Sequence, residues 1–244
     1  MVRPMVSKVR LYVEHPLGEG QTVPLTREQA HYLFGVMRLG EGDVISLING
    51  QDGEWDARVE AAGKKRGVLL CQAQTAPLQV PPDLWLLFAP IRKERTAFIV
   101  EKAVEMGASR ISPVQTDFTQ AANRVRQDKL QAHAIEAAEQ CGGTFVPPVD
   151  EVKKLSAVLA GWPTDRHLMF CDELLAGDPV ALPKLRGPWA ILIGPEGGFS
   201  PAERDHLRAL PFAHPVSLGP RILRADTAAV AAMTLWQQAL GDWA

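Results

Sequence analysis

The chain has 244 residues, of which 46% are hydrophobic and 22% charged, and its formal net charge is -2. This composition excludes a disordered or fibrous chain and leaves room for one large domain or two smaller ones. The slightly acidic total excludes nucleic-acid binding through overall charge, so any such contact needs a local basic patch. Three widely spaced cysteines and six scattered histidines predict neither a metal site nor a disulfide framework. We expect a soluble cytoplasmic protein that has no membrane segment.

The first 75 residues have the pattern of short strands separated by turns. Period-2 apolar positions and turn residues predict strands at residues 10–13, 44–48, 54–59 and 67–73. Thr26 followed by Gln29 has the spacing of a capping box and predicts one helix, which ends near Gly40. The pattern therefore predicts a small β-domain interrupted by a helix.

Three prolines within residues 75–83 cannot continue a strand ladder or a helix. We therefore predict a domain over residues 1–75, a proline-rich linker over residues 76–83 and a second domain over residues 84–244.

Behind this linker, apolar runs alternate with helical patterns. Strands are predicted at residues 84–91, 110–114, 167–171, 189–193 and 216–218, and helices at residues 92–107, 128–141 and 226–240. Such alternation is typical of a mainly parallel sheet with helices on both faces, so the fold class is α/β.

A glycine-rich stretch, GPEGG at residues 194–198, follows the strand predicted at residues 189–193. Ligands of open parallel sheets bind beyond the carboxyl ends of the strands, and glycine lets the backbone approach a ligand closely. Ser200, Pro201 and Glu203 predict a helix start directly afterwards. The standard dinucleotide and phosphate fingerprints are missing. The stretch therefore indicates either a ligand loop without a phosphate signature or a plain tight turn.

A second Gly-Pro stretch, LGPRILRADTAA at residues 218–229, places Arg221 and Arg224 three residues apart, shortly before Asp226. Two such loops suit a small cofactor held by backbone groups beside an anionic substrate. The alternative is a solvated helix start, or ion pairs of the two arginines with Asp226 and Glu196.

The stretches IGPEGGFSPAE and LGPRILRADTAAVAA resemble the ribosomal RNA small subunit methyltransferase E family, which methylates ring nitrogen 3 of a uridine in 16S ribosomal RNA with S-adenosylmethionine. Further similar segments occur at residues 31–38, 101–107 and 137–142. The resemblance implies a PUA-like β-barrel that binds RNA, followed by a SPOUT-class methyltransferase domain, a knotted parallel sheet with a C-terminal trefoil knot. It also implies a homodimer that acts on 16S ribosomal RNA or the small ribosomal subunit.

The resemblance implies roles for individual residues. The two loops would wrap the cofactor, largely through backbone groups, at Leu192, Ile193, Gly194, Pro195, Glu196, Gly197, Gly198, Leu218, Gly219, Ile222 and Leu223. Arg221 and Arg224 are candidates for holding the uracil oxygens and a phosphate, and Glu196 or Asp226 for accepting the proton of ring nitrogen 3.

Exposed cations are the candidate RNA contacts, although each small cluster is equally typical of a solvated turn. They are Arg38, Lys64, Lys65, Arg66, Arg92, Lys93, Arg95, Arg124 and Arg126.

The chain departs from the family pattern near the substrate. The family usually has Thr-Glu where this chain has Ala225 and Asp226, and it commonly has arginines near Phe118 and Gly143. Four functions stay open: the uridine methyltransferase, a methyltransferase with another RNA target, an RNA-binding or ribosome-assembly protein without turnover, and a small-molecule enzyme that binds a nucleotide at the first loop.

Overall fold

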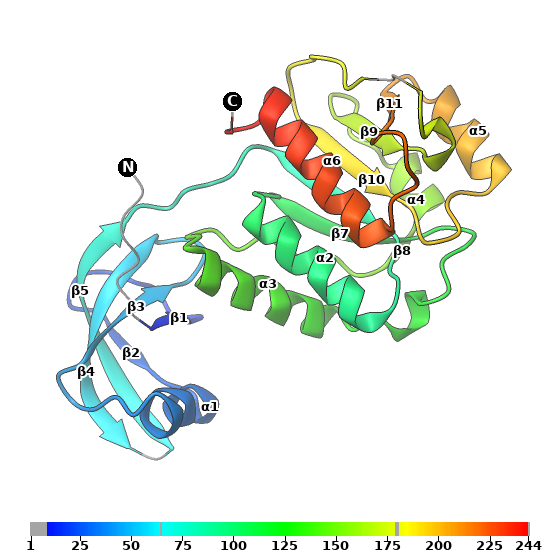
Figure 1. Ribbon diagram of the computed structural model, residues 1–244. Coiled ribbons are helices and arrows are strands. Elements are labelled where there is room, and N and C mark those ends of the chain that lie inside the picture. The colour runs from blue at the N-terminus through cyan, green and yellow to red at the C-terminus, as the bar shows by residue number, and fades with distance from the viewer. Residues whose placement is uncertain (1–8, 64, 179–180, 244) are drawn as a thin grey trace. The chain divides into compact units, whose positions relative to one another are not determined.

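The computed structural model describes residues 9–63, 65–178 and 181–243. They form two compact units, both drawn in Figure 1. The front unit contains the described residues up to 80 together with residues 138–146, and the rear unit contains residues 81–137 and the described residues from 147 onward. The division expected from the sequence put residues 138–146 in the rear domain. Arg10 holds them in the front unit, because its guanidinium donates to the carbonyls of Ala138, Glu139 and Gly143 at 2.7, 2.8 and 3.0 Å.

The front unit is built on a five-stranded sheet with the order β1-β3-β4-β5-β2. Its strands are β1 (Arg10–Tyr12), β2 (Thr22–Pro24), β3 (Val44–Ile48), β4 (Glu54–Gly63) and β5 (Arg66–Ala76). β1 pairs with β3 in parallel, and the other pairs are antiparallel. The four predicted strands are confirmed. The sequence pattern missed β2, a three-residue strand at the edge of the sheet.

The helical segment of the front unit begins as predicted but continues differently. Both bonds of the capping box between Thr26 and Gln29 are present, at 2.9 and 3.2 Å. α1 (Arg27–Ala30) then runs directly into a π-helix, η1 (His31–Val36), where the sequence predicted one helix. Arg38 follows with φ +59°, and it is the one non-glycine residue of the described part with a positive φ.

The rear unit contains a six-stranded sheet with the order β11-β9-β10-β6-β7-β8, in which every pair of neighbours is parallel. Its strands are β6 (Leu84–Phe88), β7 (Arg110–Gln115), β8 (Lys153–Lys154), β9 (His167–Cys171), β10 (Trp189–Ile193) and β11 (Ala213–Val216). The predicted α/β class is confirmed. All five residues of β10 are buried, as expected for a central parallel strand.

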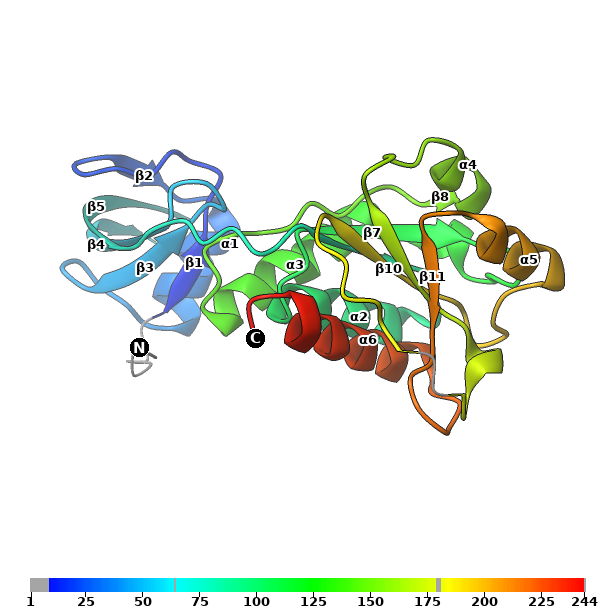
Figure 2. The same ribbon diagram turned by 90° about the horizontal axis from the view of Figure 1, so that it is seen from above.

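Helices cover both faces of this sheet. They are α2 (Lys93–Glu105), α3 (Gln127–Cys141), α4 (Leu155–Ala160), α5 (Pro201–Ala209) and α6 (Ala225–Leu240), with short 3₁₀ turns η2 (Ala122–Arg124) and η3 (Glu173–Leu175). Figures 1 and 2 show α2 and α6 side by side on one face, and α4 and α5 on the other. None of the helices formed by the described residues is long and apolar enough to cross a membrane.

Two predicted strand boundaries are wrong. β6 ends at Phe88 instead of residue 91, because Pro90 has no N–H with which to extend the ladder. The strand predicted at residues 216–218 ends at Val216, where it should have begun, because the next residue has already left the sheet: Ser217 donates its hydroxyl to the carbonyl of Leu175 at 2.8 Å. The chain therefore turns away from β11 directly into the second Gly-Pro loop.

Candidate active site

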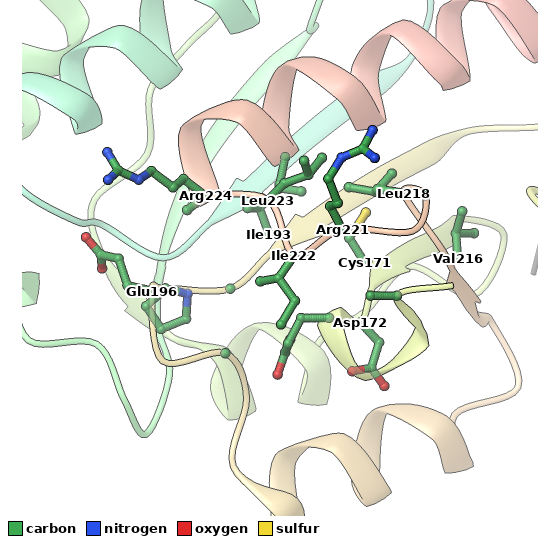
Figure 3. Close-up of a pocket in the computed structure, with 18 residues that line it drawn as sticks. Cys171, Asp172, Ile193, Glu196, Val216, Leu218, Arg221, Ile222, Leu223 and Arg224 are labelled. Atoms are coloured by element: carbon green, nitrogen blue, oxygen red, sulfur yellow. The ribbon is translucent and has the colours of Figure 1, made fainter. Parts of the chain in front are cut away.

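A pocket of about 210 Å³ lies at the carboxyl edge of the parallel sheet (Figure 3). The ends of β9, β10 and β11 and the loops that follow them line the pocket. Because these strands are parallel, the loops after them meet at this edge. The start of α6 closes one side. The residues that line the pocket are Cys171, Asp172, Glu173, Ala176, Ile193, Gly194, Pro195, Glu196, Gly198, Val216, Leu218, Gly219, Arg221, Ile222, Leu223, Arg224, Ala225 and Ala228.

The structure brings together most of the residues predicted to hold a cofactor. Both Gly-Pro loops contribute to one pocket although they are separated by α5 and β11 in the chain. Two predicted residues lie elsewhere. Leu192 is buried within β10, and Gly197 lines a neighbouring groove instead of the pocket.

The glycines of the pocket have two different reasons to be glycine. A Cβ at residue 194 would lie 2.8 Å from the ring of Phe199, and Gly198 has φ +68° and leaves room for the carboxylate of Glu173. These two residues permit packing within the protein. Gly219 has φ +107°, and a Cβ added there would meet no heavy atom of the described residues within 4 Å, its chain neighbours aside. Only this last position fits the expectation that glycine leaves space for a ligand.

An acidic wall of the pocket was not predicted from the sequence. Asp172 directly follows β9, and its buried carboxylate accepts from Arg204 Nε at 3.0 Å and from Arg208 at 2.6 Å. Glu173 also pairs with Arg204, at 2.5 Å. The two arginines belong to α5, so these ion pairs fix the loop after β9 against that helix. The sequence signal that could have identified Asp172 is its position directly after a predicted parallel strand.

Cys171 lies beside this wall but is no nucleophile. Burial raises the pKa of its thiol to about 12, so the thiol stays protonated at neutral pH. Among the described residues, no group of three or more His, Cys, Asp or Glu side chains is arranged to hold a metal ion.

Three of the four candidate catalytic residues line the pocket with unpaired charges. Within the described chain, the side chains of Glu196, Arg221 and Arg224 make no hydrogen bond or ion pair, and all three are exposed. Figure 3 shows Glu196 and Arg224 extending on the same side of the pocket, whereas Arg221 extends away from them. The fourth candidate, Asp226, is not part of the lining and pairs with Arg95 at 3.3 Å. The alternative in which both arginines pair with Asp226 and Glu196 is therefore wrong.

A second, larger hollow adjoins the pocket, and we call it the basic groove. It has a volume of about 1330 Å³ and lies between the start of α2, the loop after β7 and the first turns of α3. Glu196 lines both the groove and the pocket. The cations of the groove are Arg92, Lys93, Arg124, Arg126 and Lys129. Arg126 is partly neutralised by Asp128 at 2.9 Å.

The other candidate RNA contacts lie outside the groove. Arg95 does not line it, because its guanidinium lies beside Asp226. Arg38, Lys65 and Arg66 are exposed side chains of the front unit. Lys64 lies outside the described residues. The roles of all these side chains stay predictions.

Comparison with known proteins identifies the family. Residues 79–237 match the RNA methyltransferase domain family, and residues 25–70 match the RNA methyltransferase PUA domain family. The ribosomal RNA small subunit methyltransferase E of Rickettsia conorii is 27% identical over 92% of this chain and 93% of its own. The protein of that name from Synechocystis is 30% identical over 87% and 71%.

A solved structure agrees with these relatives. The ribosomal RNA small subunit methyltransferase E of Neisseria gonorrhoeae, bound to S-adenosyl methionine, superposes with a TM-score of 0.85 and 28% identity over 97% of this chain and all of that one. Sequence and fold thus agree over nearly the whole length. The chain belongs to the ribosomal RNA small subunit methyltransferase E family.

Proposed function

We propose that this protein transfers a methyl group from S-adenosylmethionine to ring nitrogen 3 of a uridine in the 16S ribosomal RNA of the small ribosomal subunit. Family membership supports the reaction class and the ribosomal RNA substrate. The observation that carries the proposal is the position of Glu196, whose unpaired carboxylate borders both the pocket and the basic groove. Such a group can act where a cofactor in the pocket meets an RNA in the groove.

The pocket fits the proposed cofactor. Val216, Leu218, Ile222 and Leu223 provide apolar surface for the adenosine portion, and Gly219 leaves open space beside its backbone. The carboxylate of Glu196 suits a positively charged sulfonium. When bound, the cofactor supplies an electrophilic methyl group on that sulfonium.

The residues around the pocket must make the uracil nitrogen reactive. Ring nitrogen 3 of neutral uracil carries a hydrogen and is a poor nucleophile, so a base has to remove this proton. Glu196 has no hydrogen-bond or ion-pair partner among the described residues, whereas Asp226 is paired with Arg95. We therefore propose Glu196 as the base that accepts the proton of ring nitrogen 3. Arg224, which extends on the same side of the pocket, would stabilise the negative charge that develops on the uracil oxygens.

The basic groove and the front unit provide the expected RNA contacts. Arg92, Lys93 and Arg124 line the groove without a side-chain ion pair in the described part of the chain, so they are free to meet phosphates. The front unit matches a PUA domain of RNA methyltransferases and adds exposed cations of its own. We also propose that the protein works in the cytoplasm as a homodimer with a knotted rear domain, as the family resemblance implies.

The deciding experiment measures methyl transfer from labelled S-adenosylmethionine to small ribosomal subunits from a strain that lacks this protein. We expect labelled 3-methyluridine in the nucleoside digest of 16S ribosomal RNA. Another labelled nucleoside would indicate a different target. Cofactor binding without any label would contradict the proposal and favour an RNA-binding or assembly protein.

A further inference from the structure

Phe118 is an exposed aromatic side chain in the basic groove, whose lining combines cations with apolar residues. It follows β7 at the carboxyl edge of the sheet and is 46% exposed. It lines the basic groove together with Arg92, Lys93 and Arg124, and it does not line the cofactor pocket. An aromatic side chain exposed to this extent contributes little to the core, so its position needs another explanation.

The backbone that carries Phe118 is held firmly. The N–H of Asp117 donates to Glu203 at 2.9 Å, and the carboxylate of Asp117 accepts from the hydroxyl of Ser200 at 2.5 Å. The hydroxyl of Thr119 accepts from the N–H of Thr116 at 2.9 Å. The loop is thereby tied to the start of α5, so the ring projects from a fixed base.

One side of Phe118 is covered and the other is open. A Cβ placed on Gly197 would lie 3.5 Å from Cβ and 3.6 Å from Cδ2 of Phe118, so the side chain lies against the first Gly-Pro loop. Its exposed part belongs to the groove that Glu196 shares with the pocket. A planar group bound in the groove would therefore find a flat apolar surface close to the proposed reaction centre.

We propose that Phe118 stacks with an unpaired base of single-stranded RNA in the basic groove, next to the nucleotide that is methylated. This inference rests on the proposed function and adds a binding subsite to it. The neighbouring cations match the phosphates on either side of such a base, and aromatic side chains beside basic grooves hold single-stranded RNA in this way. Every base has an aromatic face, so the subsite binds a base without reading its identity.

The test measures the affinity of the full chain for two labelled probes: a short oligouridylate, and a chain of the same length that lacks bases. Phe118→Ala is expected to weaken binding of the oligouridylate about 5- to 150-fold, the range for stacking of one base. Binding of the abasic chain stays unchanged, because phosphate contacts are intact. For the same reason the salt dependence stays that of the wild type.

Three further variants separate stacking from folding and from plain apolar contact. Phe118→Trp is expected to retain the affinity for the oligouridylate, whereas Phe118→Leu, apolar but not planar, loses it. Phe98→Ala removes a similarly exposed aromatic that lies on α2 outside the groove, and its affinity stays that of the wild type. Equal affinity of Phe118→Leu and the wild type would overturn the inference. So would a Phe118→Ala variant that loses affinity equally for both probes, or a wild type that binds no oligouridylate.

Methyl transfer measured in parallel keeps the two proposals apart. Phe118→Ala is expected to raise the KM for small subunits while the affinity for S-adenosylmethionine stays constant. A loss of cofactor affinity would place the ring in the cofactor site and overturn the inference. If the wild type and the variants bind RNA as expected but the wild type methylates nothing, the stacking subsite is supported and the proposed function is contradicted.

Discussion

Arg166, at the amino edge of the rear sheet, and the charges at the rim of the pocket, at the carboxyl edge, differ in their pairing. At the amino edge, Arg166 directly precedes β9, makes two bonds of 2.8 and 2.9 Å to the carboxylate of Asp83 and lies 3.6 Å above the ring of Trp85. It also donates to the carbonyl of Trp189 at 2.8 Å. At the carboxyl edge, Glu196, Arg221 and Arg224 have no side-chain partner among the described residues.

The difference separates stability from function. A buried charge that is paired holds elements of the fold together, and removing it leaves its partners without their hydrogen bonds. A charge left unpaired at the rim of a pocket contributes little to folding and is available to a ligand. Substitutions of the unpaired charges at the pocket rim should therefore change rates, whereas substitutions of paired charges, such as Arg166 at the amino edge or Asp172 at the carboxyl edge, should change stability.

The largest expected effect is on catalysis. Glu196→Gln keeps the size of the side chain but removes the proposed proton acceptor, so kcat for methyl transfer should fall about 10²- to 10⁴-fold. The free energy of unfolding should change by less than about 0.5 kcal/mol, because the side chain is exposed. Asp226→Asn serves as the control. A larger rate loss in that control than in Glu196→Gln would reverse the assignment of the proton acceptor.

Arg224 should rank next. Arg224→Met removes the cation that extends on the same side of the pocket as the carboxylate of Glu196. We expect kcat to fall about 10²-fold, as for loss of one stabilising donor. Arg221→Met should have a smaller effect on kcat, since this side chain extends elsewhere. Single-turnover rates at saturating cofactor measure both. Equal rates for Arg224→Met and the wild type would exclude a catalytic role for Arg224.

At the amino edge, Arg166→Met should lower the free energy of unfolding by about 2 kcal/mol, because the bonds to Asp83 and Trp189 are lost while the apolar stem is kept. The exposure of Asp83 limits the loss. Urea unfolding measures the change. The affinity of the folded variant for S-adenosylmethionine should match that of the wild type, and a large loss of affinity would show that the two edges are not independent.

The smallest effect should be a pH dependence at the same edge. Nδ1 of His167 and Nε2 of His214 lie 3.1 Å apart, and burial, with a smaller contribution from the charge of His167, lowers the pKa of His214 below 6.5. The unfolded chain therefore binds more protons than the folded chain as the pH falls below about 6.5, so stability present above that pH is lost on acidification. His214→Gln should make the urea midpoint depend less on pH between about pH 5 and pH 8. The same dependence of the urea midpoint on pH in His214→Gln and the wild type would exclude this histidine as the cause of the loss of stability in acid.

Local signals in the sequence predicted much of the fold correctly. Both capping boxes, at Thr26 and Ser200, form as their spacing indicates, because each joins residues only three apart. The apolar runs of β6, β9 and β10 were recognisable because strands buried on both faces must be apolar throughout. The π-helical turn at residues 31–36 was not recognisable, since its helical periodicity resembles that of an α-helix.

The sequence by itself determined the α/β class, the two Gly-Pro loops and the family resemblance, because these depend on residues close together in the chain. Only the tertiary structure decided which charges are free. It paired Asp226 with Arg95, which is 131 residues away, and it buried Asp172 between two arginines of α5. It also placed Phe118 beside Gly197. Side-chain partners depend on which strand ends the sheet brings together, and the strand order cannot be predicted from the spacing of residues close together in the sequence.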